Sequence, residues 1–389
     1  MDQRYRRVFQ LGRGGMGEVW LGVRHGAGGF RRFVVLKRIR LDGQSDEAMA
    51  RFVAEARVAA RLHHPNIVAV YDFGRFDAGG DASGWFIVME YLAGASLYDV
   101  LRRAYQEQVA VPPEVILAVG IGVLRGLECA HGHGVLHRDV SPDNVIITFE
   151  GAVKLLDFGI AKDTHAAEQA PSDGDPFPVG GFMTVPGGVA GKRRYLAPER
   201  VVGDSASAES DLYSLALVML ELFGCQLPDT GADVAGTPTP LSDAGLGPPE
   251  GLDDVLSRAL SSHPKRRFRS AGAMAAALRR VAVTLPAVEL GPWVRELCPS
   301  RYEIARRLGK LETPDADAVE AVFRDIALPT VEVSPPQPGA RPGAVEALVD
   351  RLVAVGPKID VPPEPAVQTP RTQVQPPKPT RTPSRTIPD

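Results

Sequence analysis

Residues 137–144 read HRDVSPDN, and residues 153–159 read VKLLDFG, with an apolar run, VII, directly after the first stretch. The first stretch places a carboxylate, Asp139, and an amide, Asn144, five residues apart in a short predicted loop. A second carboxylate, Asp157, follows Asn144 by 13 residues, at the end of the second apolar run. Carboxylate and amide oxygens are protein ligands of Mg²⁺. The two stretches therefore predict a site that holds Mg²⁺ against phosphates.

Phosphoryl transfer suits such a set of side chains, because it needs little covalent catalysis and much management of charge. Asn144 and Asp157 supply two oxygen ligands for Mg²⁺, which takes its remaining ligands from phosphate and water. A separate carboxylate must orient the attacking hydroxyl and accept its proton, and Asp139 can do both. We therefore predict Asp139 as the catalytic base and Asn144 and Asp157 as metal ligands.

A glycine-rich stretch, LGRGGMGEVW at 11–20, has the spacing G-x-G-x-x-G at Gly12, Gly14 and Gly17. Glycines let a strand–turn–strand segment close over phosphates without Cβ clashes and leave backbone N–H groups free to donate. A dinucleotide-binding fold uses the same spacing but needs a helix after the glycines. Here strand-like residues, EVWLGV, follow instead. The pattern favours a phosphate-binding hairpin, although taken alone an ordinary glycine turn explains it equally well.

Lys37 lies in a predicted strand, FVVLKRIR at 33–40. A lysine flanked by apolar residues is costly to bury unless it is paired. A ligand phosphate and a carboxylate are the two candidate partners, and Glu55, on the predicted helix at 46–62, is the natural carboxylate. Taken alone, a solvated strand lysine is the simpler interpretation.

Together these segments resemble the eukaryotic-like (Hanks-type) serine/threonine protein kinases of bacteria. The order is that of the family: glycine-rich loop, strand lysine, helix glutamate, HRD with its asparagine, DFG, and then APE at 197–199. The resemblance covers residues 5–282 and implies an α+β, bilobal fold. That fold has a small lobe of antiparallel β-sheet with one helix and a larger, mainly α-helical lobe, with ATP between them.

The resemblance implies ATP and Mg²⁺ as cofactors and gives each matching residue a role. Lys37 would contact the α and β phosphates and pair with Glu55, and residues 90–92 would meet adenine through backbone groups. Asp211 would anchor the catalytic loop, and Arg267 would pair with Glu199. The residues expected around ATP are Leu11, Gly12, Gly14, Gly15, Gly17, Val19, Lys37, Glu55, Glu90 and Leu92.

Two positions depart from the family pattern. Serine/threonine kinases usually carry a lysine two residues after the catalytic aspartate, where this chain has Ser141. They usually carry a threonine in the stretch before APE, where GKRRY at 191–195 has Lys192. The family fold places these two positions opposite each other, so we predict an exchange in which Lys192 delivers its ammonium to the γ-phosphate as a catalytic group. The alternative is that Lys192 is a surface residue of a slower kinase.

The segment between Asp157 and Glu199 is long and rich in Gly, Pro and Ala. Phosphorylation could order it by pairing with Arg138, a common switch in the family that the sequence resembles. An insertion without regulatory role is the alternative interpretation. The candidate phosphorylation sites are Thr164, Ser172 and Thr184.

Composition sets further limits. A net charge of −3 over 389 residues gives no argument for nucleic acid as a partner. Three dispersed cysteines suggest neither a disulfide framework nor a zinc site. No signal-peptide pattern opens the sequence, and the richest apolar stretch, at 212–223, is shorter than the roughly 20 residues of a membrane span. We therefore predict a cytoplasmic protein without a membrane span.

Four parts follow along the chain: a kinase N-lobe at 1–92, a C-lobe at 93–285, a helical extension at 286–328 and a proline-rich disordered tail at 329–389. The tail could dock a regulatory protein, although an inert tail is the simpler interpretation.

The predicted function is ATP-dependent phosphorylation of serine and threonine hydroxyls on proteins, with autophosphorylation in the long loop. The main alternative is a pseudokinase that acts as an ATP-binding scaffold, and Ser141 is the one residue that supports it. A small-molecule kinase would usually lack the APE stretch at 197–199. Tyrosine specificity is a further alternative, because Ser141 removes the usual serine/threonine marker.

Overall fold

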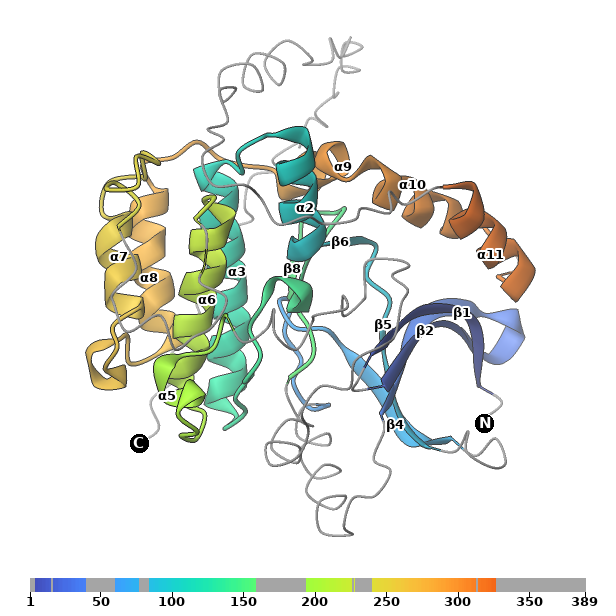
Figure 1. Cartoon of the computed structure of the whole chain (residues 1–389). Coiled ribbons are helices and arrows are strands. Elements are labelled where there is room, and N and C mark those ends of the chain that lie inside the picture. Colours follow the sequence, from blue (N-terminus) through green and yellow to red (C-terminus); the bar gives the residue numbers. More distant parts are fainter. Residues whose placement is uncertain are drawn as a thin grey trace, which may run out of the picture. The chain divides into compact units, whose positions relative to one another are not determined.

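The computed structural model contains a five-stranded antiparallel sheet, followed along the chain by a mainly helical region (Figure 1). The structure describes residues 4–14, 17–39, 60–76, 84–158, 194–225, 227, 240–312 and 314–326. Glu55, most of the predicted helix at 46–62 and the predicted tail at 329–389 lie outside the described residues.

The sheet has the spatial order β1-β2-β3-β5-β4, so the two strands of the glycine-rich stretch form a hairpin at one edge. Gly14 pairs with Gly17 across the end of this hairpin. In register, Val19 of the hairpin lies opposite Lys37, which in turn lies opposite Ile87. The strands are β1 (Tyr5–Gly14), β2 (Gly17–His25), β3 (Arg31–Ile39), β4 (Val70–Phe76) and β5 (Gly84–Glu90).

Alternation along the strands divides their apolar side chains between two faces, because successive residues of a strand point to opposite sides. One face carries Leu21, Val35 and Met89, which belong to one buried cluster. The other carries Val34 and Val88, which belong to a second cluster. Lys37 follows Val35 by two residues, so its side chain leaves the sheet on the Val35 face.

The larger region begins after β5 with a short three-stranded sheet and continues with helices. The small sheet consists of β6 (Gly94–Ser96), β7 (Val145–Thr148) and β8 (Val153–Leu155). The helices are α2 (Leu97–Glu107), α3 (Pro113–Gly132), α5 (Pro198–Val201), α6 (Ala208–Leu222), α7 (Leu252–Ala259) and α8 (Ala271–Ala282). Short 3-10 turns lie at Ala27–Gly29, Pro142–Asn144 and Pro264–Arg266.

Helices α3 and α6 form the centre of this region. Helix α6 is buried on nearly all sides, which explains its run of apolar residues without an amphipathic pattern. It begins with a reciprocal cap, in which Ser207 and Ser210 bond each other's backbone N–H. Within the described chain, α3 is the helix long and apolar enough to cross a membrane by length and composition, but 61% of its most apolar window is buried inside the protein.

Three further helices, α9 (Leu290–Leu297), α10 (Pro299–Leu308) and α11 (Ala316–Asp325), follow α8. They run from the neighbourhood of α2 and β7 past β6 to β1, as Figure 1 shows in orange. They fall in the segment for which the sequence predicted a helical extension. The boundaries assigned to lobes, extension and tail stay predictions, whereas the α+β fold, with its antiparallel sheet and larger helical part, is confirmed.

Gly94, where the chain enters β6 after β5, provides a test of this packing. A Cβ at Gly94 would overlap the carbonyl oxygen of Ile147 and lie 2.8 Å from the Cα of Thr148, both of which are backbone atoms that cannot rotate away. We expect Gly94→Ala to lower the free energy of unfolding by about 1 to 3 kcal/mol, measured by chemical denaturation.

The matched control is Gly132→Ala at the end of α3, where a Cβ meets nothing within 4 Å. Alanine favours a helix over glycine, so this variant should be as stable as the original protein or slightly more stable. Equal stability of the two variants would contradict the close approach of β6 to β7.

Candidate active site

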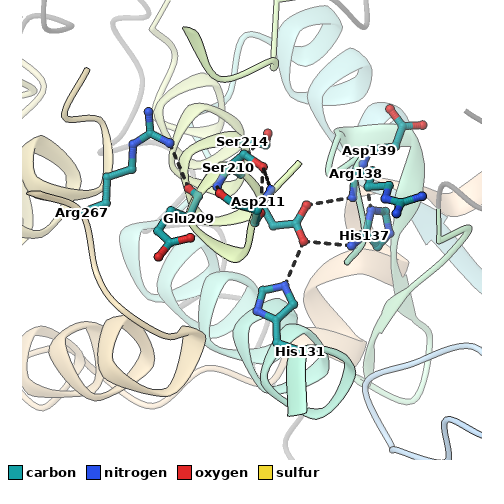
Figure 2. Close-up of polar contacts among 10 residues, drawn as sticks. His131, His137, Arg138, Asp139, Glu209, Ser210, Asp211, Ser214 and Arg267 are labelled. Atoms are coloured by element: carbon teal, nitrogen blue, oxygen red, sulfur yellow. Dashed lines mark hydrogen bonds and ion pairs between the residues drawn. The ribbon is translucent and has the colours of Figure 1, made fainter. Parts of the chain in front are cut away.

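The catalytic loop predicted at 137–144 is held by one buried carboxylate. Asp211, in the first turn of α6, is 2% exposed. It accepts hydrogen bonds from the backbone N–H groups of His137 and Arg138, both at 2.8 Å, and its Oδ2 lies 2.9 Å from Nε2 of His131 (Figure 2). Hydrogen bonds to a charged acceptor are stronger than neutral ones, so Asp211 fixes the start of the loop.

Such an anchor is needed because the loop backbone is strained. Arg138, in the loop, has φ of +66°, and Asp157, after β8, has φ of +48°, both in the left-handed region that side chains with a Cβ rarely adopt. Strained residues of this kind persist only where the surrounding structure determines them, and they cluster at functional sites. For Arg138 the bond from its own N–H to Asp211 provides that determination.

His137 connects the loop to the strand that leads to Asp157. Its Nε2 lies 2.6 Å from the carbonyl oxygen of Leu156, and the N–H of Asp139 points to its Nδ1 at 3.2 Å. These partners require a neutral ring that donates from Nε2 and accepts at Nδ1. Burial lowers the pKa of His137, which agrees with the neutral form. The ring also packs against Phe158, with centroids 4.9 Å apart.

Asp139 and Asn144 are brought together across the loop. The side-chain amide of Asn144 donates to the backbone oxygen of Asp139 at 2.7 Å and to its Oδ2 at 3.0 Å. The backbone oxygen of Asn144 accepts a hydrogen bond from the N–H of Leu156 at 2.8 Å. Asn144 therefore lies next to Leu156, the residue before Asp157. The donors of the Asn144 amide are thus turned toward Asp139, and its oxygen remains the atom suited to a cation.

Lys37 reaches the same place from the sheet. Its Nζ lies 2.8 Å from Oδ2 of Asp157. The sequence predicted Glu55 as the carboxylate partner of Lys37, and that residue lies outside the described residues. The structure therefore brings together four of the predicted chemical groups, Lys37, Asp139, Asn144 and Asp157, from β3, the catalytic loop and the end of β8.

An apolar surface adjoins these groups. Leu11 and Leu92, which the family resemblance places around ATP, belong to one buried cluster with Val35, Met89 and Ile146, and half-buried Val19 packs against it. The glycines Gly12 and Gly14 lie in β1, Gly17 begins β2, and Gly15 lies outside the described residues.

Glu90 has a role that sequence reasoning missed. Its Oε1 lies 2.7 Å from Nζ of Lys154, on β8, and accepts the N–H of Ala69 at 2.9 Å. Its side chain thereby fastens the end of β5 to β8, while its backbone N–H donates to the carbonyl oxygen of Ala69. A lysine and a glutamate 64 residues apart carry no sequence signal that they meet.

Arg267 and Glu199 form the predicted pair. The guanidinium donates to both carboxylate oxygens, at 2.6 and 2.8 Å, while its Nε donates to the carbonyl oxygen of Ser261 at 2.8 Å. The Arg267 side chain is fully buried and lies over the ring of Tyr213, 4.6 Å from its centroid. A buried ion pair is tolerated only when its remaining polar atoms are also bonded, as they are here.

The end of the segment before α5 is tied to α6. The hydroxyl of Tyr195 donates to Oε2 of Glu221 at 2.5 Å, and Arg194 lies 3.5 Å from the other oxygen. Burial raises the pKa of Glu221 and that of Tyr195. Sequence reasoning did not single out Glu221. Lys192 and the candidate phosphorylation sites Thr164, Ser172 and Thr184 lie outside the described residues.

Ser141, the residue that departs from the family pattern, is 1% exposed. Among the described residues, no hydrogen-bond partner lies within reach of its buried Oγ.

Comparison with known proteins identifies the family of this chain. Residues 5–236 match the family model described as a protein kinase domain. The chain is 35% identical to serine/threonine-protein kinase PknA of Mycobacterium tuberculosis, over 72% of this chain and 62% of PknA. It is 35% identical to serine/threonine-protein kinase PknB of Mycobacterium leprae, over 72% of this chain and 43% of PknB. The chain thus spans less than two thirds of the length of these relatives.

Among solved structures, the kinase domain of Mycobacterium tuberculosis PknI is similar, with a TM-score of 0.53 and 33% identity. The match covers 72% of this chain and 96% of that domain. The family model, the relatives and the PknI kinase domain all point to one family and one fold. This chain belongs to the protein kinase family.

Proposed function

We propose that the protein is a serine/threonine protein kinase that transfers the γ-phosphoryl group of ATP to hydroxyls of proteins. The observation that carries the proposal is the convergence of Lys37, Asp139, Asn144 and Asp157 on one place, at distances of 2.8 Å for Lys37 to Asp157 and 3.0 Å for Asn144 to Asp139. The names of the relatives, PknA and PknB, support the same class of acceptor.

Each of these groups has a part in the transfer. Asp139 would orient the substrate hydroxyl and accept its proton, since its position is fixed by the Asn144 amide and, through the backbone, by His137. Lys37 would leave Asp157 or share it when ATP binds, and its ammonium would contact the phosphates. All four groups are present and the relatives are named serine/threonine-protein kinases, so these observations outweigh Ser141 and favour an active kinase over the pseudokinase alternative.

Asn144 and Asp157 would hold Mg²⁺. No group of three or more His, Cys, Asp or Glu side chains in the described chain is arranged as a metal cage. The donor set of one amide oxygen and one carboxylate suits Mg²⁺, which is typically bound through one or two side chains and the phosphates of its substrate. When bound, the ion would neutralise charge that develops on the phosphates.

Lys192 would supply a further cation at the γ-phosphate, in place of the lysine that Ser141 replaces. Ser141 has no positive charge to place at the γ-phosphate, so the proposal assigns that charge to Lys192. The same proposal includes autophosphorylation at Thr164, Ser172 or Thr184 and a regulatory protein bound at 329–389. It also includes a cytoplasmic location, where ATP and protein substrates are present.

Intact-mass spectrometry after incubation with Mg²⁺, ATP and a peptide acceptor tests the activity. We expect the original protein or the peptide to gain phosphate and Asp139→Asn to lose this transfer almost completely, because a general base contributes about 100- to 10,000-fold. Chelation of Mg²⁺ should also stop the gain.

The matched control is Asp254→Asn, an exposed aspartate on α7, which should retain full transfer. Transfer by Asp139→Asn at the original rate would rule out the assigned base.

The exchange of lysine position is tested by Lys192→Ala. We expect turnover to fall by about 100-fold or more, while the KM for ATP barely moves, because the ammonium acts on charge that develops in the transition state. Steady-state kinetics with a peptide acceptor measure both constants. The control is Lys265→Ala, at an exposed position. Unchanged turnover of Lys192→Ala would refute the proposal that Lys192 replaces the missing catalytic-loop lysine, and would leave Lys192 as a surface residue.

A further inference from the structure

Helices α9, α10 and α11 contact both the large helical region and the sheet. In sequence order α9 packs beside α2 and β7, α10 beside β6 and α9, and α11 beside β1 and α10 (Figure 1). Strand β1 carries the first half of the glycine-rich stretch. The three helices therefore connect the core beneath the catalytic loop with the strand that leads into the phosphate-binding turn.

The first two helices are anchored in the large region. Leu290 and Val294 of α9 are buried in its main core. On α10, a guanidinium nitrogen of Arg301 lies 3.2 Å from the buried carboxylate of Asp99 on α2, with side chains 11% and 3% exposed. The ring of Tyr302 packs edge-on against Phe149, with centroids 5.2 Å apart. A buried ion pair and apolar contacts together give α10 a defined position.

Helix α11 presents an apolar stripe to the sheet. Val319, Val322 and Phe323 have the i, i+3, i+4 spacing of one helix face, and the two valines are buried. The ring of Phe323 stacks on Phe9 of β1, with centroids 4.1 Å apart and an interplanar angle of 5°. Aromatic pairs contribute energy beyond their buried area, so this stack gives the contact a preferred geometry.

The contact between α11 and β1 adjoins the buried apolar cluster next to the predicted phosphate site. Phe9 is two residues before Leu11 and three before Gly12 on the same strand. Val319 and Val322 belong to the same buried cluster as Leu11 and Met89. Ile304 and Leu308 of α10 also belong to it, so the cluster continues from the sheet into the helices anchored in the large region.

Helices α10 and α11 share apolar contacts in this cluster and one exposed ion pair. Arg307 lies 3.2 Å from the carboxylate of Asp325, and these side chains are 40% and 61% exposed. Exposed ion pairs contribute little to stability. The position of α11 is thus set mainly by apolar contacts, and Phe323 is the member of its apolar stripe that stacks on a ring of β1.

We propose that α11 is a positioning element for the glycine-rich strand. By stacking Phe323 on Phe9, from helices anchored on α2, β6 and β7, it sets the affinity of the protein for ATP. Phe323 acts through β1 and contacts no reacting atom. The proposal rests on the proposed function, because ATP is the ligand whose affinity it sets.

The test uses the full chain with Phe323→Ala and Phe323→Leu. Leucine keeps an apolar side chain on β1 but removes the stacked ring. The matched control is Glu320→Ala, an exposed residue of the same helix. Titration with a fluorescent ATP analogue gives the dissociation constant, kinetics with a peptide acceptor give kcat and KM for ATP, and thermal unfolding checks that each variant is folded.

We expect Phe323→Ala to raise the dissociation constant and KM for ATP by about tenfold, with kcat at saturating ATP within about twofold of the original. Phe323→Leu should give a smaller rise, and Glu320→Ala none. Unchanged nucleotide affinity in a folded Phe323→Ala or Phe323→Leu protein that is only less heat-stable would overturn the inference and leave the proposed function intact. An original protein that neither binds the analogue nor phosphorylates a peptide would overturn both.

Discussion

The hydrogen bonds from the backbone N–H groups of His137 and Arg138 to the carboxylate of Asp211 are the constraint on which the site depends. A carboxylate buried at the start of α6 is stable only because these donors and His131 satisfy it. The same donors belong to a loop whose backbone enters the left-handed region at Arg138. The loop N–H groups therefore satisfy the buried carboxylate of Asp211, and this carboxylate in turn stabilises the strained backbone of the loop.

The anchor at Asp211 also determines the positions of Asp139 and Asp157, through hydrogen bonds that involve the backbone. His137 bonds the carbonyl oxygen of Leu156, directly before Asp157, while Asn144 bonds both Asp139 and Leu156. The loop and the end of β8 therefore form one unit, which meets the sheet at the ion pair between Lys37 and Asp157. Phosphoryl transfer needs charged groups held in fixed positions. This unit holds Asp139 and Asp157 in position through its contacts with the core of the larger region.

The four chemical groups could be predicted from short motifs with defined spacing, and the resemblance to protein kinases added the fold class, the anchoring role of Asp211 and the pairing of Glu199 with Arg267. The sequence did not predict the ion pair of Glu90 with Lys154, or the stack of Phe323 on Phe9. These contacts join distant segments, and a helical or strand pattern indicates that a face is apolar without indicating what covers it. The tautomer of His137 likewise depends on partners that only the folded chain brings together.

Hydrogen exchange of residues 137–144 in Asp211→Asn, compared with the original protein, tests the central claim most directly. Asparagine keeps the shape but offers one acceptor oxygen, and its amide group faces a backbone N–H that it cannot bond. The account predicts faster exchange in this loop, a lower kcat, and unchanged protection in α8, far along the chain. Equal protection of the loop in both proteins would show that Asp211 does not hold it, and would contradict the account.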